Sequence, residues 1–437
     1  MWLTFVYELP KLLLIETVMT FFEPKLLLQD NIRVYSTRKS LRDHGFVLSD
    51  CPVTGRWRII SGLVICLVLA VQVGGTSAEP DSFPSLISSL EGIETLEFCG
   101  ERVPLEIEEV RERLEKELLL SVWDRAQVIL WLKRSHRYLP YIRDMLRENK
   151  MPDDLKYLPV VESALLSHIR STEGAVGFWQ FLAGTGRRYG LVINKHIDER
   201  RNLFASTRAA LRYLRDLHTT FDSWTLAVAA YNMGEHGLAG EIFEQQSTDY
   251  YNLYLPLETQ RFVFRILAVK LIFSAPEKFG FEFSEEEYYS PIRSDQVRID
   301  CSQKVPIRIV AQAAKTHFKV IKDLNQEIRG HYLRPGSHDI LIPEGAAEGF
   351  HERFRGLLDD FLAGIQGRIY VVEKGDSLSS IAEKFDIPIS ALLICNDLNP
   401  RRPIYPGNKI IICMEEKTKP GIPDIGEESV VQQLEWP

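Results

Sequence analysis

The stretch YLPVVESALLSHIRSTEGAVGFWQF, residues 157–181, places one carboxylate in a segment whose apolar spacing is that of a buried helix. Glu162 stands there among valines and leucines. A buried carboxylate that stays ionised without a partner costs on the order of several kcal/mol. We therefore expect that Glu162 is ion-paired with Arg170 or Arg187, or exposed to solvent, or held in its protonated form.

The composition is that of an ordinary globular protein. The chain has 437 residues, of which 45% are hydrophobic and 26% charged, and this length is enough for about two to four domains. A net charge of −8 gives no global attraction to nucleic acid, so we expect no nucleic-acid partner. We expect a monomer, and a peripheral association with membranes stays open.

Residues 56–78, RWRIISGLVICLVLAVQVGGTSA, have the layout of a secretory signal. Two arginines precede an uninterrupted apolar run that ends in small residues. The run is short for a bilayer core of about 30 Å, which favours cleavage over an anchor. We expect an N-terminal extension and signal peptide over residues 1–78, cleavage at Ala78, and export to the periplasm or cell envelope. A translation start near Val53 would give a signal of ordinary length.

Cysteine spacing indicates disulfide chemistry rather than a metal site. The cysteines that remain after cleavage are Cys99, Cys301, Cys395 and Cys413. An even number in an oxidising compartment permits disulfides. Cys395 with Cys413 is the pairing to test first, because both lie in one small module, and four free thiols are the alternative. No CxxC pair or Cys/His cluster is present, so we expect no zinc site.

From Pro104 onwards the pattern is helical. Apolar residues recur at spacings of three and four with charges between them, and β-branched alternation is missing. We expect Pro104 in a first turn, Pro140 to end or kink a helix, and Pro152 to open the next one. This all-α part divides into an N-terminal helical region, 79–150, and a second domain, 151–275.

An internal repeat follows a linker expected at residues 276–295. The two units align through a leucine–asparagine pair, a proline–glycine pair and a closing apolar strand. Each unit of the repeat predicts strand, helix, helix, strand. We expect small α/β modules at 296–345 and 368–414, followed by a disordered tail at 415–437.

Several short motifs downstream of Glu162 occur in the order and spacing of one known family. They include GAVGFWQF at 174–181, AAYNMG at 229–234 and ETQRFV at 258–263. In this order they resemble the Slt-type catalytic domain of lytic transglycosylases with C-terminal LysM modules, over about residues 95–414. The resemblance implies a mainly α protein with a lysozyme-like all-α catalytic domain. It also implies cleavage of the β-1,4 bond between N-acetylmuramic acid and N-acetylglucosamine in peptidoglycan, leaving a 1,6-anhydro end. Neither a metal nor an organic cofactor is implied, so we expect none.

This chemistry needs a carboxyl that still holds its proton near neutral pH. Desolvation among apolar neighbours raises the pKa of a carboxyl, as we expect for Glu162. Glu162 would protonate the glycosidic oxygen and then accept the proton of the sugar's own 6-hydroxyl. Two alternatives stay open: a hydrolytic muramidase in which Glu173 positions a water, and a non-catalytic peptidoglycan-binding scaffold.

The resemblance also implies a set of substrate-binding residues. The set is Ser171, Gly177, Phe178, Trp179, Gln180, Tyr231, Asn232, Glu258 and Thr259. Ser171 and Gln180 are expected to hydrogen-bond the substrate and the catalytic carboxyl. Phe178 and Trp179 are expected to form an apolar wall facing the sugar. Taken singly, the aromatic residues would be core side chains.

Two positions depart from the family's pattern, Phe262 at the motif's tyrosine and Phe264 at the proline two residues later. The motif that begins with Glu258 and Thr259 continues to a tyrosine in the family, and here that position is Phe262. Loss of the hydroxyl puts one substrate contact in doubt but leaves the acid in place. Asn232, taken alone, would be a helix cap.

The second repeat unit resembles a LysM domain over residues 370–412. The resemblance implies a shallow groove that binds N-acetylglucosamine chains largely through backbone groups. The expected glycan-binding residues are Gly375, Asp376, Ser377, Leu378, Asn399, Pro403 and Ile404. Ser377 should cap the first helix and Asn396 should end the second. The first unit has Lys304 and Val305 in place of the glycine–aspartate turn, so we expect a degenerate LysM with a scaffold role.

Overall fold

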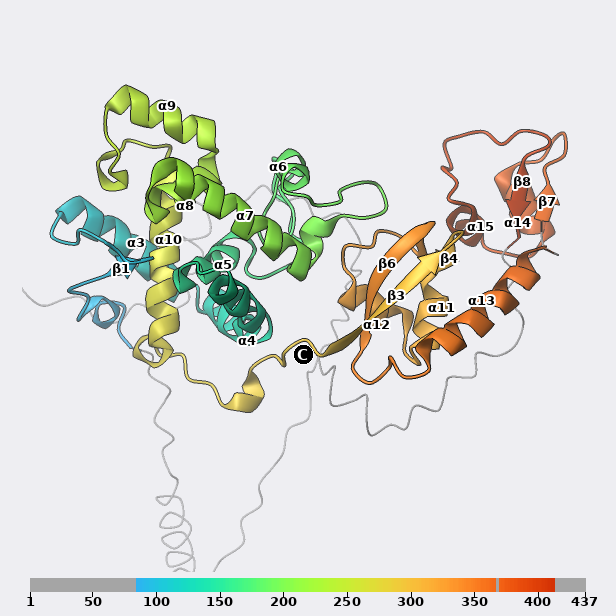
Figure 1. Ribbon diagram of the computed structural model, residues 1–437, viewed down its shortest axis with the longest axis horizontal. Helices are drawn as coiled ribbons and strands as arrows, with labels where there is room; N and C mark the ends of the chain where they lie inside the picture. Colours follow the sequence, from blue (N-terminus) through green and yellow to red (C-terminus); the bar gives the residue numbers. More distant parts are fainter. Residues whose placement is uncertain (1–83, 367–368, 413–437) are drawn as a thin grey trace, which may run out of the picture. The chain divides into compact units, whose positions relative to one another are not determined.

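The computed structural model describes residues 84–366 and 369–412 (Figure 1). These residues belong to one of the chain's two contact units, Asp81–Pro437. The N-terminal extension, the signal with its cleavage at Ala78, Cys413 and the tail at 415–437 lie outside the described residues. No helix within the described residues is long and apolar enough to cross a membrane.

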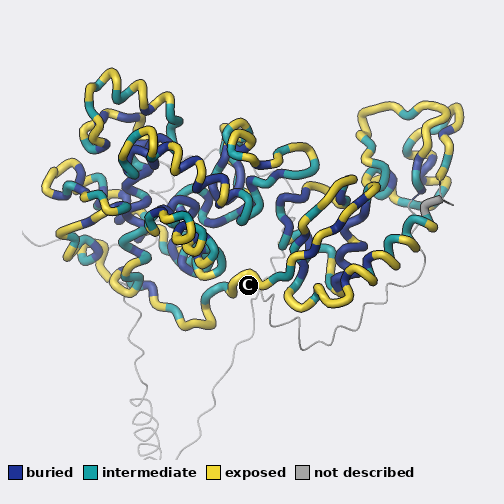
Figure 2. Tube along the Cα trace, in the orientation of Figure 1, coloured by how far each residue is buried: buried dark blue, intermediate teal, exposed yellow. Residues whose placement is uncertain are grey.

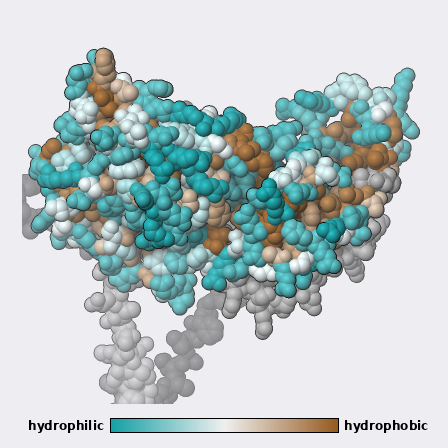
Figure 3. Space-filling view, in the orientation of Figure 1, coloured by the Kyte–Doolittle hydropathy of each residue, from teal (hydrophilic) through white to brown (hydrophobic). Residues whose placement is uncertain are grey.

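The first part of the described chain is built almost entirely of helices, as the sequence predicts. Its α-helices are α3 (Glu108–Trp123), α4 (Arg125–Glu148), α5 (Leu158–Ser163), α6 (Ala183–Arg188), α7 (Leu203–Phe221), α8 (Trp224–Met233), α9 (Glu235–Gln245) and α10 (Leu257–Ser274). Two short antiparallel strands, β1 (Glu97–Phe98) and β2 (Glu101–Arg102), precede them. The helices turn charged faces outward, and the surface in Figure 3 is mostly hydrophilic over this part.

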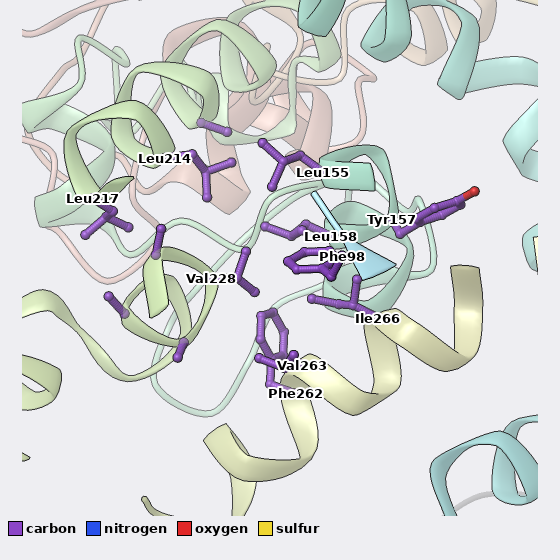
Figure 4. Close-up of a cluster of buried hydrophobic side chains, with 14 of the residues drawn as sticks. Phe98, Leu155, Tyr157, Leu158, Leu214, Leu217, Val228, Phe262, Val263 and Ile266 are labelled. Carbon is purple, nitrogen blue, oxygen red and sulfur yellow. The ribbon is translucent and has the colours of Figure 1, made fainter. Parts of the chain in front are cut away.

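Helix α10 supplies the centre of the core. Figure 4 shows Phe262 and Ile266 of α10 among buried side chains from other segments, such as Phe98 and Leu158. Burial of a large apolar side chain contributes about 1.5–3 kcal/mol. Because α10 contacts α3, α5 and α8, these buried contacts fix it against the helix that carries Glu162.

The prolines refine the sequence predictions. Pro140 lies inside α4, so of the two expected effects, an end or a kink, it does not end the helix. A proline in a helix costs about 3 kcal/mol, but α4 buries an apolar face that includes Leu139 and Ile142, and this burial offsets the cost. Pro104 precedes α3 by four residues instead of lying in its first turn. Pro152 does open a helix, the 3-10 helix η3 (Asp153–Tyr157).

The predicted linker at 276–295 is in part a packed segment. It contains the 3-10 helices η6 (Pro276–Phe279) and η7 (Glu285–Glu287). Phe279 and Phe281 are buried with residues of α3, α4 and α10 in a small apolar cluster. The prediction of a free linker is therefore wrong for this half, because its aromatic side chains gain more by burial than by exposure.

The two repeat units fold in the strand–helix–helix–strand order that their sequences predict. The first module contains β3 (Ser294–Cys301), β4 (Val305–Pro306), α11 (Ile307–Ala313), α12 (Phe318–Leu324), β5 (Tyr332–Leu333) and β6 (Gly336–Pro343). The second contains β7 (Ile369–Val371), α14 (Leu378–Lys384), α15 (Ile389–Asn396) and β8 (Lys409–Ile411). In both modules the first and last strands pair antiparallel, with Val297 opposite Ile340 and Tyr370 opposite Ile410.

Helix α13 (Phe350–Gln366) follows the first module and was not predicted. Exposed and buried residues alternate along it (Figure 2). Phe350 and Phe354, one turn apart, stack with ring centroids 5.8 Å apart and join the core of the first module. The spacing of four between these aromatic residues was the sequence signal for this helix.

The cysteines divide into free and bonded ones. Cys99 and Cys301 are free, whereas Cys395 is disulfide-bonded. The alternative of four free thiols is therefore wrong. The expected partner of Cys395, Cys413, lies outside the described residues.

Each module is closed by an asparagine at the end of its second helix. The Asn325 side chain donates to the carbonyl of Leu341 and accepts from its N–H, both at 2.8 Å. Asn396 makes the same pair of bonds to Ile411, also at 2.8 Å. The sequence alignment through leucine–asparagine pairs matched Asn325 with Asn399. The shared hydrogen bonds show that the structural equivalent of Asn325 is Asn396 instead. Asn396 ends α15, as predicted.

We expect Asn325→Ala and Asn396→Ala each to lower the free energy of unfolding of its module by about 1–3 kcal/mol, because the last strand loses both partners. Thermal and urea denaturation of the full chain would measure this. Gln326→Ala is the matched control, since that amide makes one exposed bond to the carbonyl of Asp323. Unchanged stability of both asparagine variants would contradict the prediction.

Candidate active site

Helix α5 presents Glu162 on its last turn. Leu158 and Val160 of the same helix are buried in the core and anchor it. The helix then ends in two consecutive left-handed residues, Ala164 with φ 52° and Leu165 with φ 60°. Non-glycine residues in this region carry strain, which often marks functional sites. The surrounding packing holds the turn, so the position of Glu162 is fixed by the fold.

Glu162 is half-buried, and its pKa is raised to about 8. Burial is the largest cause, the negative charge of Glu258 adds to it, and Arg265 opposes it. Within the described residues, its carboxyl makes no hydrogen bond or ion pair. The expected ion pair with Arg170 or Arg187 is therefore wrong, and Arg187 donates instead to the carbonyl of Ile193. A carboxyl in this environment is mostly protonated at pH 7.

Helices α8 and α10 meet beside Glu162. The hydroxyl of Tyr231 donates to the carbonyl of Trp179 at 2.7 Å, and the charge of Glu162 contributes to a raised pKa of Tyr231 after burial. The hydroxyl of Thr259 donates to the side-chain carbonyl of Asn232 at 2.9 Å. Asn232 lies inside α8, so the cap interpretation is wrong and this residue joins the two helices.

The loop that follows α5 is closed by its own polar groups. The Ser171 hydroxyl accepts from the N–H of Ala175 at 3.2 Å. The Gln180 amide donates to the carbonyl of Gly177 at 2.8 Å. Neither side chain is hydrogen-bonded to Glu162, so the expected bonds to the catalytic carboxyl are not found. Both side chains bind backbone atoms of the loop instead. Without these bonds, the backbone groups would lack hydrogen-bond partners within the protein.

The expected sugar-facing wall is also corrected. Phe178 and Trp179 are buried in the core, and Trp179 is 0% exposed. The indole N–H of Trp179 donates to the hydroxyl of Thr207 at 3.0 Å. Because burial of an indole needs such a partner, Thr207 explains how the core accommodates it. These two residues therefore support the site from below and do not line its surface.

Gly177 holds the loop close to a neighbouring turn. It has φ +87°, and a Cβ there would lie 1.9 Å from the carbonyl oxygen of Arg200. Only glycine fits both conditions. In the structure its role is close backbone packing, and no side chain at this position could contact a substrate.

A buried ion pair locks the same loop, and sequence reasoning assigned it no role. Asp198 and Arg200 are both buried and form two bonds of 2.8 Å. Arg200 also donates to the carbonyls of Gly174 and Phe181, at 3.0 and 3.1 Å. The two residues belong to the DERRN segment at 198–202. The spacing of an acidic and a basic residue in this segment was the sequence signal that could have indicated the ion pair.

The remaining carboxylates near this region are solvated. Glu173 is exposed, and a hydrogen bond from Thr172 holds its pKa below the ordinary value. Glu258 is exposed at the start of α10. Phe262, one turn further along the helix, is 3% exposed and packs in the core. The residue that replaces the family's tyrosine is therefore a core residue here.

A groove that sequence reasoning missed opens next to Asn232 along the chain, with a volume of about 470 Å³. It is lined by Gly184, Thr185, Arg188, Tyr213, Met233, Gly234, Glu235, His236 and Gly237. Arg188 and Glu235 form one wall through two bonds of 2.7 and 2.9 Å. No single sequence motif indicated the groove because its lining comes from three separate segments.

In the second module the expected glycan-binding residues lie on the turn before α14, on the first residue of α14, Leu378, and on the loop after α15. Ser377 caps α14, as predicted. The Asp376 carboxylate accepts from the N–H of Glu373 at 2.7 Å and from the hydroxyl of Tyr370 at 2.8 Å, so it shapes the turn. Gly375 has φ +99°, which suits that turn. The other loop contributes Asn399, Pro403 and Ile404, of which the first two are exposed.

Comparison with known proteins gives two family domains. A model of the transglycosylase SLT domain matches residues 140–254, and a model of the LysM domain matches residues 370–412. Membrane-bound lytic murein transglycosylase D of Escherichia coli strain K12 is 30% identical over 335 residues, 72% of each chain. The protein of the same name from Escherichia coli O6:H1 gives the same values.

Among solved structures, the 70 kDa soluble lytic transglycosylase of Escherichia coli is 16% identical with a TM-score of 0.29, over 41% of this chain and 31% of that chain. An inactive mutant of lytic transglycosylase Slt from Pseudomonas aeruginosa is 20% identical with a TM-score of 0.27, over 36% and 27%. Likenesses this low add nothing to the sequence comparison. Because the 30% identity to the murein transglycosylases extends over more than two thirds of both chains, this chain belongs to the family of membrane-bound lytic murein transglycosylase D.

Proposed function

We propose that Glu162 is the acid and then the base with which this lytic transglycosylase cleaves the β-1,4 bond between N-acetylmuramic acid and N-acetylglucosamine. The observation that carries the proposal is the half-buried, unpaired carboxyl of Glu162 with its pKa of about 8. A general acid works best with a pKa near the working pH, because it must hold its proton and still release it.

The proposed reaction needs one carboxyl and no water. Glu162 gives its proton to the glycosidic oxygen as the bond from that oxygen to the anomeric carbon breaks. The 6-hydroxyl oxygen of the same muramic acid then bonds to the anomeric carbon. Its proton passes to the Glu162 carboxylate, which restores the acid. The products are a free 4-hydroxyl on N-acetylglucosamine and a 1,6-anhydro end.

Tyr231, Asn232, Glu258 and Thr259 support this step in the proposal. Tyr231 and Glu258 both interact electrostatically with Glu162. The exposed carboxylate of Glu258 disfavours a second negative charge and so favours the protonated form of Glu162. The hydrogen bond between Asn232 and Thr259 joins α8 to α10 and so fixes the positions of Tyr231 and Glu258.

The second module, described over residues 369–412, would hold the glycan strand while the helical domain cuts it. Tethering raises the local concentration of substrate without new catalytic contacts. We propose the domain division 79–150, 151–275, 296–345 and 368–414, with the first module as a scaffold. We also propose export to the periplasm or cell envelope, as a monomer that can associate peripherally with a membrane.

Glu162→Gln is expected to reduce the release of muropeptides from sacculi by about 10²–10⁴-fold, the usual contribution of general acid–base catalysis. Glu173→Gln, an exposed carboxylate on the following loop, is the matched control and should keep wild-type activity. Mass spectrometry of wild-type products should find anhydro ends, which are lighter than hydrolysed ends by one water. Hydrolysed ends would identify a muramidase, and full activity of Glu162→Gln would contradict the proposed role.

The pH dependence should follow the protonation of Glu162. Because the protonated form is the acid, kcat/KM should fall as the pH rises through about 8. The folded-state pKa is raised above the ordinary 4.5, so the stability that protonation contributes is present below pH 4.5 and lost as the pH rises through about 8. Glu162→Gln should therefore raise the Tm more at pH 8.5 than at pH 5. An equal effect at both values would contradict the raised pKa.

A further inference from the structure

A second buried carboxylate lies in the helical domain, and nothing in the reaction above uses it. Glu117 on α3 is 3% exposed and sits between the buried residues Leu114 and Leu118. Charged groups are almost never this buried unless they are paired. The partners of Glu117 therefore decide what it does.

Both partners are arginines of α10. Arg261 binds the Glu117 carboxylate through two bonds, of 2.5 and 3.1 Å. Arg265, one turn further along α10, places its Nε 3.8 Å from the second carboxylate oxygen. That distance is too long for a hydrogen bond, so Arg265 is held by charge alone. The side chains of Arg261 and Arg265 are 35% and 34% exposed, which leaves both guanidinium groups partly in water.

Arg265 also acts on the active-site carboxyl. It opposes the burial and the Glu258 charge that keep Glu162 protonated. Since α10 contacts both α3 and α5, Arg265 lies on the helix that joins the two carboxyl groups. Arg265 therefore lies beside the buried carboxyl of Glu117 and also acts electrostatically on Glu162, an acid that must stay neutral.

We propose that Glu117 is a positioning residue for the acid–base step, because it binds Arg265 and so limits how strongly this guanidinium can pair with Glu162. The proposal rests on the proposed role of Glu162. An opposite charge within about 4–6 Å commonly lowers the pKa of a carboxyl by about 1–3. Unrestrained, Arg265 would return Glu162 to an ordinary carboxylate, which has no proton to give to the leaving group.

The other groups that face Glu162 do not replace this restraint. From α10, Glu258 is an exposed carboxylate that favours protonation of Glu162. From α8, Tyr231 is neutral, and its pKa is well above the ordinary value. From α4, Arg134 donates to the backbone carbonyl of Ala164 at 3.2 Å. Around Glu117, the facing cations are Arg261 and Arg265, both from α10.

The test is the pH profile of muropeptide release by the full chain. Glu117→Gln frees Arg265 and should move the high-pH limb of kcat/KM to lower pH by about one unit, so that activity at pH 8 falls about 10-fold relative to its own optimum. Arg265→Gln removes the cation and should move the same limb to higher pH. Opposite shifts of one limb are not expected from two variants that merely loosen the fold.

Two controls separate charge from stability. Glu109→Gln removes the carboxylate of an exposed pair with Arg113 on the same helix, and it should leave both activity and profile unchanged. Arg261→Gln breaks the two-bond contact and should lower the Tm without moving the limb to lower pH, because Arg265 stays held by Glu117. If Glu117→Gln does not fold, Arg265→Gln still carries the test, since it leaves the pair of Glu117 and Arg261 intact.

An unmoved limb in Glu117→Gln, or a limb that Arg265→Gln fails to move upward, overturns the inference. Failure of the proposed function looks different: Glu162→Gln would then keep wild-type activity. If Glu162→Gln is inactive and the limb of Glu117→Gln is unmoved, Glu162 remains the acid and only the role of Glu117 is rejected.

Discussion

Desolvation of a single carboxyl is the constraint on which the helical domain depends. Glu162 is placed on the last turn of α5, among buried residues, with no polar partner in the described part of the chain. Such a carboxyl is costly to ionise, so its environment keeps the proton on it. Helix α10 contributes in two ways. Its core residues fix its position, and its charged residues Glu258 and Arg265 act on the pKa of Glu162.

Polar side chains near α5 hold the position of Glu162 by hydrogen-bonding to backbone atoms of the neighbouring loop. Ser171 and Gln180 close the loop after α5, and the buried pair of Asp198 and Arg200 ties that loop to the next turn. Trp179 packs beneath it with its N–H on Thr207. The result is a rigid support under a carboxyl that itself stays unbonded, which is the preorganisation expected of an acid catalyst.

Sequence reasoning predicted the helices, the two small modules and the raised pKa of Glu162, because apolar periodicity and an isolated carboxylate are local signals. It failed where the answer depends on distant partners. The sequence alone does not tell whether Phe178 and Trp179 face a sugar or the core, and only their burial in the structure decides for the core. Glu117 reads as one more surface charge in the run ERLEKELLL. Its burial becomes visible only with Arg261, 144 residues away along the chain.

The central claim is that the fold holds Glu162 protonated near neutral pH. The most direct measurement is an infrared pH titration of the full chain, taken as the difference between wild type and Glu162→Gln. We expect a protonated carboxyl band at pH 7 that is lost with a midpoint of about 8. A midpoint near the ordinary value of 4.5, with no such band at pH 7, would contradict it.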